Sequence, residues 1–148
     1  MRLSAAVCAL TLLVPTLALA QAPPKPAPDQ PVVAAYYYRV RWGFQEEFQR
    51  LFFKNHYPVL KAEMTASGPI SSVLVFTPTF HGDGRADWTF LVVITYKNWA
   101  AMSQPREKGL LERLFPDQAT FQKEEQRRFE IVEAHWDVPL TTIEPPKP

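Results

Sequence analysis

The chain has 148 residues, of which 47% are hydrophobic and 13% aromatic, enough to build one packed domain and to exclude general disorder. Its 16 basic and 15 acidic residues leave a formal net charge of +1. This balance gives no electrostatic basis for binding a nucleic acid or an anionic membrane.

The first twenty residues have the pattern of a cleavable signal peptide. Arg2 precedes an apolar run, and residues 18–20 (Ala-Leu-Ala) supply the small-x-small pattern of a cleavage site. An uncleaved anchor is the alternative, but the run is short for a membrane span and contains Pro15. The single cysteine, Cys8, lies in the leader, so the mature chain has no thiol for disulfides, catalysis or metal binding. We therefore expect an exported protein, periplasmic or secreted, that does not associate with a membrane after cleavage.

Two proline-rich segments flank the predicted domain. Residues 21–31 contain five prolines and prefer an extended polyproline conformation that cannot bury a core. Residues 141–148 close the chain in a similar way. The folded domain is therefore predicted over residues 32–140.

The first predicted strand covers residues 32–42 and is rich in aromatic and β-branched side chains, which strands favour. Alternation separates its side chains into two sets, with Ala34, Tyr36, Tyr38 and Val40 on one face and Tyr37, Arg39 and Arg41 on the other.

A long helix is predicted over residues 44–66, because apolar residues recur at helical spacing and Gly68-Pro69 provides a strong stop. Pro58 is expected to kink or interrupt this helix. The helix carries two apolar stripes, which indicates burial on more than one side, including under a partner subunit.

A hairpin follows, with strands over residues 70–80 and 87–96 joined by the polar loop HGDGRA. Pro78 places the first of these strands at a sheet edge. Short helical segments begin near Lys97 and again at Pro116-Asp117, the latter running to about Arg128.

The last predicted strand covers residues 131–138. Uninterrupted alternation places Val132, Ala134, Trp136 and Val138 toward the helices and Glu133, His135 and Asp137 on the other face. The charged set, with Arg39 and Arg41, is expected to form a salt-bridge network at a dimer interface, with anion binding as the alternative.

The predicted order β-α-β-β-α-β specifies an α+β, ferredoxin-like fold. Right-handed crossovers give a four-stranded antiparallel sheet, in the order 4-1-3-2, with helices on one face.

Several segments together resemble the dimeric α+β-barrel superfamily, which includes antibiotic-biosynthesis monooxygenases, EthD-like proteins and NIPSNAP-like domains. They are RVRWG, EEFQRLFFKNHYPVLKAEMTASG and TYKNWAAM, and residues 55–60 (Asn-His-Tyr-Pro-Val-Leu) are similar to a His-x-Pro-Leu-like segment of EthD-like members. The resemblance implies a homodimer, with a pocket between sheet and helices in each protomer. Its members include cofactor-free oxygenases, haem enzymes and proteins without known activity, so fold membership does not specify function.

His56 is the leading candidate for a functional residue, and the only candidate for catalysis. It lies at the edge of an apolar stripe, directly before Tyr57-Pro58, from where it can reach the predicted pocket as a base, a hydrogen-bond donor or a haem ligand. The alternative is a structural histidine that bonds near the kink. Tyr36, Tyr38 and Trp136 are predicted to line the same pocket, with ordinary core filling as the alternative for the tyrosines.

No metal site is predicted, because the three histidines show no H-x-H, H-x-x-x-H or HExxH spacing. No G-x-S-x-G motif supports a serine hydrolase. Because no complete catalytic apparatus is present, we favour an exported domain that binds a small apolar or aromatic molecule without a cofactor. The alternative is a monooxygenase-type oxidoreductase, cofactor-free or haem-dependent.

Overall fold

A computed structural model of the protein describes residues 29–79 and 88–143. The predicted leader, nearly all of the proline-rich spacer, the HGDGRA loop and the end of the tail lie outside these residues. Within the described ranges, no helix combines the length and apolarity needed to cross a bilayer.

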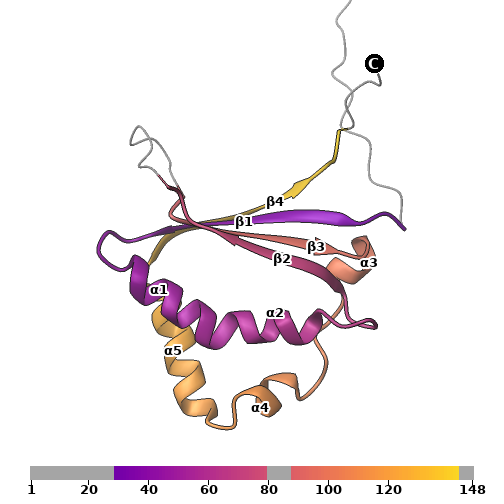
Figure 1. The fold of residues 1–148 in the computed structure, drawn as a ribbon. Coiled ribbons are helices and arrows are strands. Elements are labelled where there is room, and N and C mark those ends of the chain that lie inside the picture. The colour runs from indigo at the N-terminus through magenta and orange to yellow at the C-terminus, as the bar shows by residue number, and fades with distance from the viewer. Residues whose placement is uncertain (1–28, 80–87, 144–148) are drawn as a thin grey trace, which may run out of the picture.

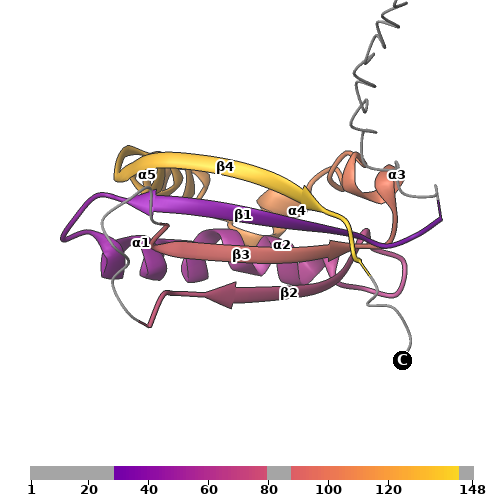
Figure 2. The same cartoon turned by 90° about the horizontal axis from the view of Figure 1, so that it is seen from above.

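Four antiparallel strands form one sheet in the order β2-β3-β1-β4, and all helices except the short α3 at one sheet end lie below it in Figure 1. The strands are β1 (Val32–Val40), β2 (Ile70–Phe76), β3 (Phe90–Tyr96) and β4 (Val132–Leu140). Figure 2, viewed from above, shows this order with the opposite sheet face uncovered. The α+β class, the strand order and the edge position of β2 were all predicted correctly.

The first strand ends two residues earlier than predicted, at Val40 rather than Trp42. Gly43 has a φ of 85°, a left-handed conformation that side chains disfavour and glycine tolerates. The chain turns there into the helical layer.

The long predicted helix forms as three continuous parts: α1 (Gln45–Leu51), the π-helical turn η1 (Phe52–His56) and α2 (Tyr57–Glu63). In the turn, the backbone N–H of Tyr57 donates to the carbonyl of Phe52, five residues earlier. A proline ring clashes with the carbonyl four residues before it, and a wider π turn relieves that crowding. Pro58 therefore changes the helix type locally, and the helix ends at Glu63, three residues before the predicted end.

Three further helices are present in the described residues: α3 (Trp99–Met102) at one sheet end, and α4 (Leu110–Leu114) and α5 (Gln118–Glu130) in the layer below the sheet. The predicted start of the last helix is confirmed, because the Asp117 carboxylate accepts the backbone N–H of Thr120 at 3.0 Å. Such a cap satisfies an N–H that has no partner within the helix.

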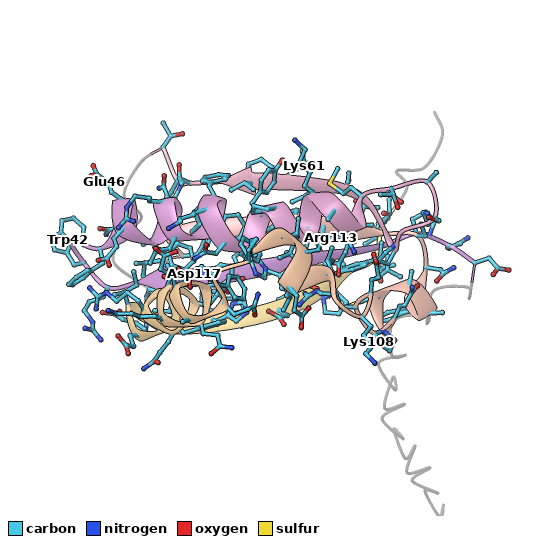
Figure 3. The ribbon with its side chains drawn as sticks, turned by 90° about the horizontal axis from the view of Figure 1, so that it is seen from below. Trp42, Glu46, Lys61, Lys108, Arg113 and Asp117 are labelled. Atoms are coloured by element: carbon cyan, nitrogen blue, oxygen red, sulfur yellow. The ribbon has the colours of Figure 1, made fainter. Side chains whose placement is uncertain are left out.

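The hydrophobic core lies between the sheet and the helix formed by α1, η1 and α2. Phe48, Phe52 and Phe90 are almost fully buried and pack edge to face, with ring centroids 4.9–5.1 Å apart where Phe90 meets the other two. Charged side chains such as Lys61, Arg113 and Asp117 lie on the exposed side of the helical layer (Figure 3).

Helix α5 packs against α1 and η1. Arg127 donates to both carboxylate oxygens of Glu47, at 2.8 and 3.0 Å. Glu124 accepts hydrogen bonds from Lys54 at 2.6 Å and from the buried Asn55 at 3.0 Å. These contacts hold α5 beneath the first helix, so the helix-facing side of β4 stays largely exposed.

The predicted faces of the last strand are wrong from Ala134 onward. The register against β1 slips at a bulge, because Val132 pairs with Val40 whereas Ala134 pairs with Arg39. A bulge inserts one extra residue, so every later side chain changes face. Trp136 therefore lies opposite Tyr37 on the uncovered face, and His135 and Asp137 lie opposite Tyr38 and Tyr36 on the helix face.

Candidate functional site

Strand β1 places Tyr36 and Tyr38 on the helix-facing side of the sheet, as its alternation predicted. The Tyr36 hydroxyl on β1 lies 2.8 Å, a hydrogen-bond distance, from the hydroxyl of Tyr96 on the adjacent strand β3. Tyr38 is buried and packs on Phe48 and Phe90, with ring centroids 5.2 and 6.1 Å away. The two tyrosines therefore share a face but differ in accessibility.

His56 is the last residue of the π turn, and its ring lies 5.4 Å from that of Phe52, between centroids. Tyr36, Tyr38 and His56 line one cavity of about 190 Å³ between α2 and the sheet. The rest of its wall is formed by Leu60, Glu63, Val92, Ile94, Tyr96 and Arg106. Three of the four predicted site residues are thus brought together.

Burial, together with the nearby positive charge of Arg128, lowers the pKa of His56 to about 4. The imidazole is therefore neutral at pH 7, with one N–H and one free lone pair. Neither ring nitrogen forms a hydrogen bond with any of the described residues. Neither nitrogen is fully buried without a partner, so both remain accessible. Both nitrogens are therefore available to a molecule in the cavity.

The tyrosines of the cavity remain protonated. Burial raises the pKa of Tyr38 to about 12, although the nearby Arg128 guanidinium acts in the opposite direction. Burial, followed by the hydrogen bond to Tyr96, raises the pKa of Tyr36 well above its usual value. These hydroxyls can donate or accept hydrogen bonds, but they do not supply a phenolate near neutral pH.

Arg128, on α5, does not line the cavity but is 1% exposed and acts electrostatically on both His56 and Tyr38. Its Nε and one Nη donate to the two carboxylate oxygens of Glu125, at 3.0 and 2.8 Å. The other Nη is buried and has no hydrogen-bond partner. An unpaired buried donor of this kind is costly. The positive charge of Arg128 also acts to lower the pKa of both Tyr38 and His56.

Trp136, the fourth predicted site residue, does not line the cavity. Its ring stacks on Tyr37 on the uncovered face, with centroids 5.3 Å apart and planes 10° apart. His135 takes the inward position and stacks on Tyr38 at 4.1 Å. One of its ring nitrogens lies 2.9 Å from the Tyr37 carbonyl and the other 3.2 Å from the Asp137 carboxylate.

Sequence reasoning missed Tyr96, Glu63 and Arg106 as members of the cavity wall. Tyr96 continues the alternation of Phe90, Val92 and Ile94, so the pattern contained the signal. Arg106 comes from the segment between α3 and α4, where no periodicity applies.

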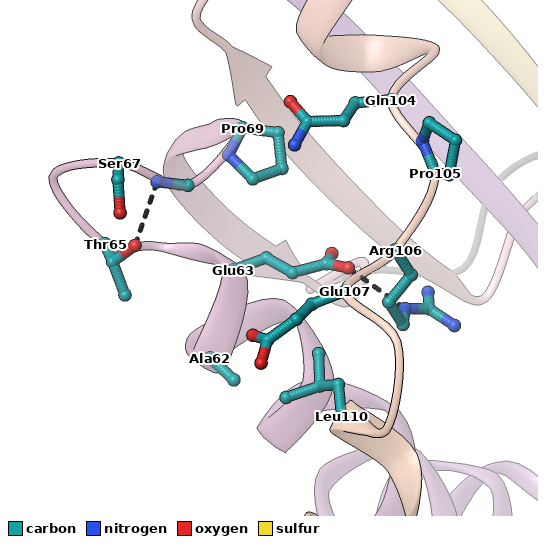
Figure 4. A pocket seen from close by; sticks show the side chains of 11 residues that line it. Ala62, Glu63, Thr65, Ser67, Pro69, Gln104, Pro105, Arg106, Glu107 and Leu110 are labelled. Atoms are coloured by element: carbon teal, nitrogen blue, oxygen red, sulfur yellow. Dashed lines mark hydrogen bonds and ion pairs between the residues drawn. The ribbon is translucent and has the colours of Figure 1, made fainter.

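A second cavity of about 310 Å³ lies beside the first and shares Glu63 and Arg106 with it (Figure 4). Thr65, Ser67 and Gln104, exposed residues of two connecting segments, form part of its wall. The Thr65 hydroxyl already accepts the backbone N–H of Gly68 at 2.9 Å. Because none of the described residues unique to this cavity combines burial with a free polar group as His56 does, the first cavity is the stronger candidate.

No family model matches the chain, and no curated protein matches it by sequence. Its fold is similar to that of a NIPSNAP family protein from Agrobacterium tumefaciens, at 16% identity and a TM-score of 0.53, over 78% of this chain and 88% of the other. A protein from Arabidopsis thaliana matches at 8% identity and a TM-score of 0.51, over 78% of this chain and 99% of the other.

A third match is a candidate antibiotic biosynthesis monooxygenase from Bacteroides thetaiotaomicron, at 11% identity and a TM-score of 0.47, over 80% of this chain and 95% of the other. At these identities the likeness concerns the fold alone. With its sheet order β2-β3-β1-β4, the chain thus has a ferredoxin-like α+β fold similar to those of the Agrobacterium and Arabidopsis proteins, which confirms at the level of fold the resemblance predicted from its sequence.

Proposed function

We propose that this chain is an exported domain that binds a small apolar or aromatic molecule in the cavity lined by Tyr36, Tyr38 and His56. The observation that carries the proposal is His56: a neutral, desolvated imidazole that faces the cavity without a protein partner among the described residues. A ligand that hydrogen-bonds to the accessible ring nitrogens would gain about 0.5–1.5 kcal/mol of net binding free energy for each bond.

The experiment is native mass spectrometry of the purified protein, followed by binding measurements on His56→Ala for any ligand that is found. We expect His56→Ala to abolish binding and to change the melting temperature only modestly. Tyr37→Phe, on the opposite sheet face, is the control and should bind normally. A large loss of stability in His56→Ala, with binding intact in the folded fraction, would instead indicate a structural histidine.

No cofactor is part of the proposal. A cavity of about 190 Å³ is too small for a porphyrin, so a haem would require the helices to move away from the sheet. A Soret band in the purified protein, or oxygen uptake with quinol substrates, would contradict the proposal in favour of the oxidoreductase alternative.

The partner that we propose is a second copy of the chain, packed on the uncovered sheet face. Five large apolar side chains are exposed there: Leu74 at 55%, Phe76 at 43%, Leu140 at 42%, Val138 at 37% and Trp136 at 36%. An exposed apolar patch of this kind is unusual for a monomer. A two-fold axis would place the patch of one copy against the same patch of the other. Arg39 and Glu133, which form the one described ion pair on this face at 3.3 Å, neutralise each other within the protomer and leave no net charge to oppose this contact.

Export is tested separately from binding. Expression of the full chain in a bacterium, followed by N-terminal sequencing of the periplasmic or secreted product, should give a mature protein that begins at Gln21. An intact Met1 on a cytoplasmic product would contradict export while leaving the binding proposal in place.

A further inference from the structure

We propose that the ligand of this cavity is a single-ring carboxylate whose carboxylate group pairs with the outer edge of the Arg106 guanidinium. The inference rests on the proposed small-molecule binding and adds a ligand class to it.

Arg106 presents a free, pre-positioned hydrogen-bonding edge. Its Nε donates to Glu63 at 3.0 Å, and none of the described residues bonds to either Nη. A guanidinium has two edges that can each hold an oxygen pair, and the contact to Glu63 uses only part of one. The ion pair, visible in Figure 4, holds the side chain in place, which reduces the entropy lost when a ligand binds.

A count of unpaired groups in the cavity wall favours an acceptor-rich ligand. The free donors are the two Nη groups of Arg106, one N–H of His56, the hydroxyl proton of Tyr38 and one hydroxyl proton of the Tyr36–Tyr96 pair. The free acceptors are the second oxygen of Glu63 and one lone pair of His56, besides the hydroxyl oxygens. A carboxylate offers only acceptors, and its hydrogen bonds to a guanidinium are among the strongest in proteins.

The charge of Glu63 opposes this binding, and Arg106 compensates for it. Near His56 and Tyr38, Arg128 adds a second guanidinium that is paired with Glu125 on one edge and unpartnered at one Nη. Both ion pairs are neutral in sum. The Arg128–Glu125 pair leaves one buried donor without a partner, and the Arg106–Glu63 pair leaves two Nη groups against one carboxylate oxygen, so unpaired donors outnumber unpaired acceptors. The local field therefore favours a negatively charged group over a positively charged one.

The size and the remaining wall define the rest of the ligand. At about 190 Å³ the cavity lies below the usual range of about 300–1,000 Å³ for drug-sized ligands, so it accommodates one ring. Leu60, Val92 and Ile94 supply an apolar surface between Arg106 and the tyrosines. Benzoate is therefore the natural probe, and benzamide is its uncharged counterpart.

The test measures binding of benzoate and benzamide to the purified protein by titration calorimetry and by NMR of the His56 ring. We expect benzoate to bind about tenfold more tightly than benzamide and to shift the His56 signals. Arg106→Lys keeps the charge beside Glu63 but removes the two-pronged edge, and it should weaken benzoate binding about tenfold. Arg113→Gln is the matched control, because Arg113 forms a similar pair with Glu107 at 2.9 Å on the exposed surface and should bind as the wild type does.

Each other outcome overturns a defined part of the proposal. Equal binding of benzamide and benzoate, with the His56 signals shifted, rejects the carboxylate and leaves small-molecule binding standing. Unchanged benzoate affinity in Arg106→Lys rejects the role of Arg106. Equal losses in Arg106→Lys and Arg113→Gln indicate nonspecific attraction. Absence of binding by both probes, with a ligand found by native mass spectrometry, rejects the ligand class alone, and absence of any ligand rejects the proposed function as well.

Discussion

The two faces of the sheet use similar residues in different ways. On the helix side, Tyr36 and Tyr38 contribute to a core and a cavity in which burial raises the pKa of both tyrosines and lowers that of His56. On the other side, Tyr37 and Trp136 stack on each other at a surface that no described element covers. Residues adjacent in the chain thus enter environments of opposite character, one beneath the helices and the other on a sheet face that no described element covers.

The largest expected effect is on the covered face. Phe48 is fully buried among aromatic rings, so Phe48→Ala should lower the free energy of unfolding by about 3–5 kcal/mol. Leu74→Ala on the other face, measured at concentrations where the protein is monomeric, should cost less than about 1 kcal/mol. Urea denaturation of both variants tests the comparison, and similar losses would show that the second face is packed in the monomer.

The next effect concerns the uncovered face. Leu74→Glu places a charge in the proposed interface and should cost the dimer about 2–5 kcal/mol, which converts it to monomer at micromolar concentration. Lys61→Glu, on the exposed side of α2, is the control and should leave the mass unchanged (Figure 3). Light scattering measures both, and a wild type that is monomeric at that concentration would eliminate the proposed dimer.

Acid should destabilise the covered face through His56. Its pKa is about 4 in the folded chain and 6.5 in the unfolded reference, so the unfolded state takes up the proton first as the pH falls. The contribution to stability is fully present above about pH 6.5, decreases toward pH 4 and is lost below it. The total loss is at most about 3 kcal/mol.

Denaturation curves of the wild type and of His56→Gln between pH 7 and 4 isolate this contribution. As the pH falls, the wild type should lose that amount of stability relative to His56→Gln. His135→Gln, which retains His56, serves as a comparison, and its stability should still decrease with falling pH through His56. A constant difference between His56→Gln and the wild type would mean that the ring is solvated in the folded protein.

The smallest effect separates adjacent tyrosines. Tyr36→Phe removes the 2.8 Å hydrogen bond to Tyr96 in a half-buried site and should cost about 1 kcal/mol. Tyr37→Phe removes a hydroxyl for which the described residues supply no partner, keeps the ring that stacks on Trp136, and should change stability by less than about 0.5 kcal/mol. Thermal unfolding of the two variants measures both losses. A larger loss of stability in Tyr37→Phe than in Tyr36→Phe would contradict the assignment of the two tyrosines to opposite faces of the sheet.

Much of the fold follows from local pattern. Alternation in residues 32–40 and 90–96 correctly separated helix-facing side chains from those on the opposite face, because both strands are inner and pair without a slip between them. The start of α5 followed from Asp117, since a cap depends only on neighbours within one turn. Strand alternation and helical spacing also correctly predicted that Tyr36, Tyr38 and His56 line one cavity.

Other features depend on contacts that no local pattern contains. The bulge at Glu133 arises from pairing between β4 and β1, which lie about a hundred residues apart, and a slip of one residue moved Trp136 out of the cavity wall and His135 to its side of the sheet. Arg106 reaches the cavity because its segment crosses over Glu63, a contact between helix and loop. The sequence alone therefore determined the faces of the inner strands and the position of His56, through the period of each element, whereas pairing register and loop placement, which depend on distant partners, decided which side chains complete the site.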